Sequence, residues 1–147
     1  MPLEIVSVPS LPPEAAEVDF SFEIDGEILA PFDDEPFRVR PLPPRRKLYG
    51  LDEALFEARD AAEAALFLAR EGSGVAGYVA VCRGWNGCAE IDDIAVARSF
   101  RRRGLAGRLM DSAVLWARAE AGMAQEANTT SWSILAKLSK VFLTSAT

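Results

Sequence analysis

The fold of this chain is limited above all by an uninterrupted change from strand to helix over residues 91–107, IDDIAVARSFRRRGLAG. Ile91, Ile94 and Val96 are apolar and partly β-branched, which suits a pleated, half-buried strand. Beyond a basic turn, apolar residues recur at the three- and four-residue spacing of a helix: Leu105, Leu109, Ala113, Trp116 and Ala117. The sequence therefore predicts a strand, a glycine-containing basic turn and a helix, in that order.

The start of that helix is a candidate anion site. The first turn of a helix presents backbone N–H groups without partners in the helix, at the positive end of the helix dipole. Gly104, Ala106 and Gly107 leave room for a phosphate to approach the backbone. Three arginines beside them add positive charge and forked donors: Arg101, Arg102 and Arg103. We expect the anion to be a pyrophosphate; the alternative is that the glycines serve only the turn and the arginines are solvated.

The pattern Arg101-x-x-Gly104-x-Ala106 resembles the (Gln/Arg)-x-x-Gly-x-(Gly/Ala) signature of the GNAT superfamily of N-acetyltransferases, whose turn binds the pyrophosphate of acetyl-CoA. Upstream, the segments LYGLDE, ALFLAR, GYVAV, RGWNG and AEIDDIAV resemble, in this order, the streptothricin acetyltransferase branch. The resemblance covers residues 47–122. It implies an acetyl-CoA-dependent N-acetyltransferase that acetylates an amine of a small cationic molecule, a streptothricin-type antibiotic, and so confers antibiotic resistance.

The implied fold is α/β (α+β), a GNAT-like mixed sheet that is mostly antiparallel and flanked by helices. After Gly122 only about three residues stand where the family has a full strand, and the sequence given ends at Thr147, before the family's last strands. We therefore expect the C-terminal strands to be missing or shortened. The alternative function is that of an inactive, truncated relative that at most binds CoA. An open sheet edge on that side favours a homodimer.

The resemblance also implies site residues. Those for acetyl-CoA are Ile94, Ala95, Val96, Arg101, Arg102, Arg103, Gly104, Leu105, Ala106, Gly107 and Asn128. Asp92 and Asp93 are the catalytic candidates, which would bind the cationic amine or relay its proton. Adjacent strand residues project to opposite faces, so at most one of the two reaches a substrate unless a bulge intervenes. The alternative is that they pair with arginine or lie at a solvated edge. The family's proton-donating helix tyrosine is replaced by Leu135.

Upstream of this motif the sequence predicts further elements. All nine prolines lie in residues 1–46, so we expect a loosely ordered segment over 1–17 and a single domain over 18–147. Strands are predicted over 18–24 and 37–42, with an Asp25-Gly26 turn between them, and a helix over 52–64. Three further strands, 65–70, 75–82 and 88–96, form an antiparallel meander that leads to the basic turn, and the final helix spans 105–121.

Composition narrows the function. A formal net charge of −6 argues against nucleic-acid binding and favours cationic ligands. The chain has no histidine, which removes the commonest general base and metal ligand, and we expect no metal. No apolar stretch is long enough for a membrane span and no signal peptide is evident, which predicts a cytoplasmic location without a membrane partner. Cys82 and Cys88 flank the turn RGWNG, and we expect buried thiols rather than a disulfide.

Overall fold

The computed structural model describes residues 2–29, 38–85 and 87–120. The predictions for the short strand after Gly122, for Asn128 and for Leu135 lie outside this part of the chain. No helix among the described residues is long and apolar enough to cross a membrane.

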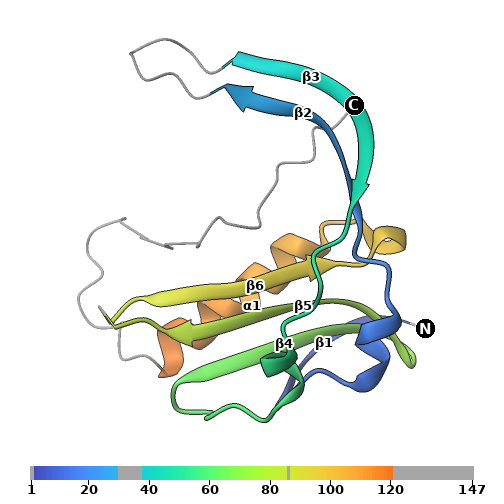
Figure 1. Cartoon of the computed structure of the whole chain (residues 1–147). Helices are drawn as coiled ribbons and strands as arrows, with labels where there is room; N and C mark the ends of the chain where they lie inside the picture. Colours follow the sequence, from blue (N-terminus) through green and yellow to red (C-terminus); the bar gives the residue numbers. More distant parts are fainter. Residues whose placement is uncertain (1, 30–37, 86, 121–147) are drawn as a thin grey trace.

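A four-stranded antiparallel sheet forms the centre of the described molecule (Figure 1). Its strands, in spatial order, are β1 (Leu3–Val8), β4 (Ala64–Glu71), β5 (Gly74–Arg83) and β6 (Ala89–Val96). The predicted meander of β4, β5 and β6 is confirmed, with ends that differ by one residue. Residues 75–81 of β5 are all buried, as expected for an inner strand whose two faces are both covered.

Helix α1 (Leu105–Glu120) covers one face of the sheet. The stripe predicted from its spacing faces inward: Leu105, Leu109, Ala113 and Ala117 are buried and Trp116 is partly buried. These side chains pack with a cluster from β5 and β6 that includes Val79, Val81 and Ile91. The helix and the strand that leads to it are therefore confirmed, and the fold is the expected mixed, mostly antiparallel one.

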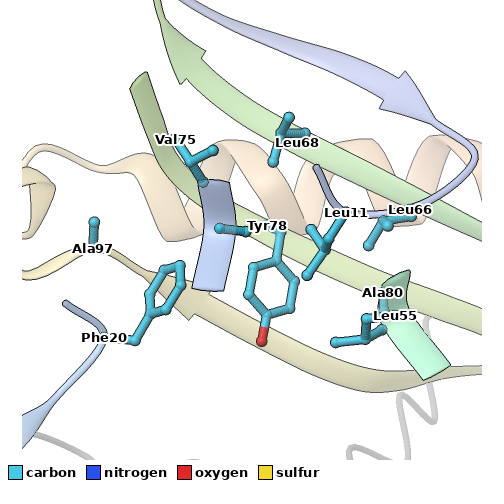
Figure 2. Close-up of a cluster of buried hydrophobic side chains, with 10 residues drawn as sticks. Leu11, Phe20, Leu55, Leu66, Leu68, Val75, Tyr78, Ala80 and Ala97 are labelled. Atoms are coloured by element: carbon cyan, nitrogen blue, oxygen red, sulfur yellow. The ribbon is translucent and has the colours of Figure 1, made fainter. Parts of the chain in front are cut away.

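The opposite face is covered by irregular chain and two short 3₁₀ helices, η1 (Pro13–Glu17) and η2 (Glu53–Phe56). Figure 2 shows this second core, in which Leu11, Phe20 and Leu55 surround the Tyr78 ring. A third 3₁₀ helix, η3 (Arg98–Phe100), joins the end of β6 to the basic turn. The sheet thus has one core on each face, and β5 contributes to both.

The N-terminal segment differs from the expectation of loose order over residues 1–17. β1 pairs with β4 from Leu3 opposite Glu71 to Val8 opposite Leu66, and η1 buries Ala15 completely. The Leu11 amide donates to the Leu55 carbonyl at 2.7 Å. The prolines interrupt this segment between its elements and leave the six-residue strand itself free to pair.

The helix predicted over residues 52–64 is wrong. Only η2 forms there, capped by the Asp52 side chain, which accepts from the Ala54 amide. The Arg59 amide donates to the Pro9 carbonyl at 3.4 Å, and the Leu55 carbonyl accepts from Leu11. Hydrogen bonds to the N-terminal segment therefore replace the helical ladder that the apolar spacing suggested.

β2 (Phe22–Leu29) and β3 (Arg38–Lys47) form a separate two-stranded antiparallel sheet that extends beyond the end of β6 (Figure 1). Both strands were predicted, but at shifted bounds. The predicted Asp25-Gly26 turn is wrong, because these residues lie inside β2 at a change of register between Ile24 and Gly26. β3 can contain prolines because, within the described residues, it pairs with β2 alone, so one of its edges needs no amide donors. Its pairing with β2 is also irregular where the register changes between Ile24 and Gly26.

Candidate active site

A β-bulge in β6 determines where the two adjacent aspartates point. Ala80 of β5 pairs with Asp93 and Val81 pairs with Ile91, so Asp92 is the extra residue. The Asp93 carboxylate accepts from the Tyr78 hydroxyl, and the Asp92 carboxylate accepts from the Cys82 thiol. Tyr78 and Cys82 are four residues apart in β5 and share a face. The bulge therefore places both carboxylates on the same face of the sheet, away from α1.

Asp93 lines a cavity of about 180 Å³ at the end of β6 where the strand leads into the basic turn. One wall consists of Ile94, Ala95 and Val96. The other sides carry aromatic rings from the sheet, from the start of β2 and from the segment after β3: Tyr78, Phe20, Phe22 and Tyr49. The cavity therefore combines the Asp93 carboxylate with four aromatic rings, and the Arg101 side chain lines it as well.

The hydroxyl of Tyr78 donates to Asp93 Oδ2 at 2.8 Å. The Tyr78 side chain is almost fully buried, and its ring meets Phe20 edge-to-face with centroids 5.6 Å apart. Burial raises the pKa of Tyr78 above its ordinary value, and the nearby charge of Asp93 and their hydrogen bond raise it further. Tyr78 therefore remains a protonated hydrogen-bond donor at neutral pH.

Asp92 has a different set of partners. Its Oδ2 lies 2.5 Å from an Arg59 guanidinium nitrogen, and its Oδ1 lies 3.2 Å from Cys82 Sγ. Burial, and then the hydrogen bond to Asp92, raise the pKa of Cys82 to about 11. Cys82 and Cys88 form no disulfide, and both are only partly buried rather than buried as expected. The alternative of an aspartate paired with arginine thus describes Asp92, whose charge is already matched within the chain.

Arg101, the first residue of the turn motif, points back into the protein. Its Nε donates to the Val96 carbonyl at 3.0 Å, and a terminal nitrogen donates to the Phe20 carbonyl at 2.9 Å. Burial, and then the charge of Arg98, lower the pKa of Arg101. Its guanidinium joins the basic turn to the end of β6 and to the segment before β2. Arg102 and Arg103 are exposed, and Arg103 lies over the Phe100 ring.

The turn itself has the backbone that an anion site requires. Arg102 and Gly104 have positive φ angles of 66° and 72°, and α1 begins directly afterwards. Within α1, the first bond to Gly104 comes from the Arg108 amide, so the amides of Leu105, Ala106 and Gly107 have no carbonyl partner in the helix. A Cβ atom at Gly104 or Gly107 would meet nothing within 4 Å. These features fit a pyrophosphate.

Most of the predicted site residues lie close together along the end of β6, the basic turn and the start of α1. Asp93, Ile94, Ala95, Val96 and Arg101 line one cavity, and residues 102–107 follow it directly. Asp92 lies on the same face but outside the residues that line the cavity. Sequence reasoning missed the aromatic rings that line it. Phe20 and Phe22 come from a segment without a recognised motif, and Tyr49 lies in LYGLDE, whose spacing does not show that its ring reaches this cavity. Tyr78 lies in the segment GYVAV, but its partner is set by strand register.

Comparisons with known proteins identify the family of this chain. The acetyltransferase (GNAT) family model matches residues 26–138. The structure of nourseothricin acetyltransferase matches with a TM-score of 0.60 at 30% identity, over 82% of this chain and 68% of that one. A second structure matches with a TM-score of 0.62 at 22% identity, over 80% of this chain and 69% of that one. It is a putative streptothricin acetyltransferase from Bacillus anthracis str. Ames in complex with acetyl coenzyme A. No curated protein sequence matches. The chain belongs to the GNAT family and is an acetyl-CoA-dependent N-acetyltransferase.

Proposed function

We propose that this enzyme acetylates an amine of a small cationic molecule, a streptothricin-type antibiotic, and thereby confers resistance to it. The observation that carries the proposal is the Asp93 carboxylate, which lines an aromatic cavity beside the strand end that leads to the basic turn. The 30% identity to nourseothricin acetyltransferase over most of both chains supports the antibiotic as substrate. A cytoplasmic location and a homodimer stay predictions from the sequence.

The helix start and its turn would hold acetyl-CoA, which supplies the acetyl group as a thioester. We assign the pyrophosphate to the amides of Leu105, Ala106 and Gly107, which open α1 without carbonyl partners in the helix. The exposed side chains of Arg102 and Arg103 would add positive charge. The backbone of residues 94–96 would run beside the acetyl and pantetheine arm. Gly104 sets the turn, and Arg101 anchors it to β6.

At the acceptor end, Asp93 would attract the ammonium group and take up its proton, because a neutral amine is the nucleophile in acetyl transfer. The rings of Phe22 and Tyr49 would lie beside the cation. Asp92 is left out of this machinery, since Arg59 already neutralises it. The net charge of −6 would favour the approach of a cationic substrate.

The test is release of the CoA thiol from acetyl-CoA by the purified full chain, with nourseothricin as acceptor. We expect release to saturate with acceptor concentration. Asp93→Asn should lower kcat/KM for the acceptor by about 10²- to 10⁴-fold, the usual contribution of a general base. The matched control is Asp92→Asn, one residue away in the same bulge, which should change kcat/KM by less than about twofold.

Two outcomes would overturn the proposal. If Asp93→Asn has the kcat/KM of the wild type for the acceptor, Asp93 is not the general base. A chain that binds acetyl-CoA but releases no thiol with nourseothricin or with other cationic amines would favour the inactive relative instead.

A further inference from the structure

The Asp93 carboxylate depends on one side chain for its orientation. Among the described residues, the Tyr78 hydroxyl is its hydrogen-bond partner, at 2.8 Å from Oδ2. A carboxylate has about four acceptor positions on its two oxygens, so a single donor at Oδ2 leaves Oδ1 available to a ligand in the cavity. The bulge at Asp92 brings the Asp93 carboxylate to the face of the sheet that lines the cavity, and the hydrogen bond from Tyr78 orients it there.

Tyr78 is itself rigidly placed. Its side chain is 1% exposed, and the ring lies in the core cluster formed by Leu11, Phe20 and Leu55 with the sheet (Figure 2). Phe20 packs against it edge-to-face. The hydroxyl, at the far end of the ring, is the polar part of a side chain that is otherwise surrounded by apolar groups. Because the ring is packed on all sides, the Tyr78 hydroxyl has a defined position.

The chemistry of the pair is directional. Burial and the charge of Asp93 keep Tyr78 protonated, so Tyr78 donates and Asp93 accepts. A hydrogen bond from a neutral donor to a carboxylate is stronger than one between neutral groups. Because its proton is directed at Asp93, the Tyr78 hydroxyl is not aimed at the thiolate that leaves during acetyl transfer. Its place in the reaction is therefore next to the acceptor amine.

We propose that Tyr78 is a positioning residue, which holds Asp93 Oδ2 so that Oδ1 faces the ammonium group of the acceptor. This inference rests on the role proposed above for Asp93. It adds a residue from the neighbouring strand β5, outside the strand–turn–helix motif, to the acceptor side of the enzyme.

The test is a double-mutant cycle of Tyr78→Phe and Asp93→Asn in the full chain, with thiol release as the assay. Tyr78→Phe keeps the ring and removes the hydroxyl. We expect kcat/KM for the acceptor to fall about 10- to 100-fold, as for loss of a hydrogen bond to a charged group, while KM for acetyl-CoA stays unchanged. In the Asp93→Asn background, Tyr78→Phe should have almost no further effect, because Tyr78 acts through Asp93.

The outcomes separate the two proposals. If Asp93→Asn is as active as the wild type, the role of Asp93 fails and the positioning role fails with it. If Asp93→Asn is impaired and Tyr78→Phe multiplies the loss, Asp93 stands and the positioning role is overturned, because Tyr78 then acts independently. The effect of acetyl-CoA on the melting temperature of Tyr78→Phe checks that the variant is folded.

A second variant tests the geometry without touching the core. Asp93→Glu keeps the charge but extends the carboxylate by one methylene, away from its fixed donor. We expect kcat to fall about 10-fold or more with little change in melting temperature. Wild-type kcat in Asp93→Glu would overturn the positioning role, since the place of the carboxylate would then not matter.

Discussion

Asp92 and Asp93 are identical and adjacent residues, yet their surroundings give them different chemistry. Asp92 is held by Arg59 and by the Cys82 thiol, whereas Asp93 meets a neutral hydroxyl and an aromatic cavity. An aspartate whose charge is matched within the chain has little left to offer a cationic ligand. The difference arises from strand register, because the bulge brings both side chains to one face and their neighbours on β5 and near η2 then separate them.

The Cys82 thiol should be slow to react. A pKa of about 11 leaves roughly one thiol in a thousand ionised at pH 8, and the thiolate is the reactive form. We expect alkylation of Cys82 by iodoacetamide to be far slower in the native chain than in urea and to rise steadily up to about pH 11. Mass spectrometry of the Cys82 peptide measures the rate. Asp92→Asn should speed the reaction, since it removes a negative charge; equal rates in native and unfolded chains would contradict the shift.

Gly104 should be needed for its backbone conformation rather than for space. Its φ is 72°, and a Cβ there would meet nothing within 4 Å. Gly104→Val would strain the turn by about 1–2 kcal/mol or shift it to another conformation. We expect acetyl-CoA affinity, measured by isothermal titration calorimetry, to fall at least about tenfold.

Gly87 offers a matched control for that substitution. It has a similar φ of 76°, and a Cβ there would also meet nothing within 4 Å. Gly87 lies in the turn between β5 and β6, however, and not in the basic turn before α1. Gly87→Val should therefore carry a similar strain and leave acetyl-CoA affinity intact. Equal loss of affinity in both variants would mean that general destabilisation, not the basic turn, explains the result.

At the scale of the element, α1 should stabilise the fold through its inward stripe. Leu109 is fully buried against the sheet, whereas Leu115 of the same helix is 65% exposed. Leu109→Ala should lower the free energy of unfolding by about 2–5 kcal/mol through lost burial and a cavity. Leu115→Ala should change it by less than about 0.5 kcal/mol. Urea denaturation followed by circular dichroism measures both, and similar losses would contradict the placement of the helix.

The elements that could be predicted are those whose pattern is local. The meander and α1 carry clear periods of two and of three to four, and they form where expected. β1 was missed because its partner, β4, lies some 60 residues away in the sequence and prolines surround it. The predicted helix over 52–64 failed because its backbone bonds to Pro9 and Leu11 instead. Apolar spacing cannot reveal such tertiary competition.

The site was predictable to a similar degree. Residues 93–107 lie along one path because they follow one another through strand, turn and helix, which is a local property. The separation of Asp93 from Asp92 was not predictable, because it depends on which residue of β6 is extra in the pairing with β5. The inward role of Arg101 was also missed, since one of the carbonyls that it binds belongs to Phe20, 81 residues away in the sequence.

At the scale of the whole molecule, the candidate site lies where the parts of the fold meet. The central sheet carries one core beneath α1 and another beneath the N-terminal segment, and the two-stranded sheet of β2 and β3 extends from the end where β6 finishes (Figure 1). Phe22 of β2 and Asp93 of β6 line the same cavity. Binding at this point should therefore stabilise the described molecule as a unit and not a single loop.

The most direct measurement is the thermal melting of the full chain with and without acetyl-CoA. Ligand at 100 times its dissociation constant should stabilise the folded state by about 2.7 kcal/mol, which corresponds to a rise of about 5–10 °C in Tm. Acetyl-pantetheine at the same concentration lacks the pyrophosphate and should raise Tm much less. A single cooperative transition with this difference is the result we expect. A melting temperature that acetyl-CoA leaves unchanged, or that both ligands raise equally, would contradict a pyrophosphate site at the start of α1.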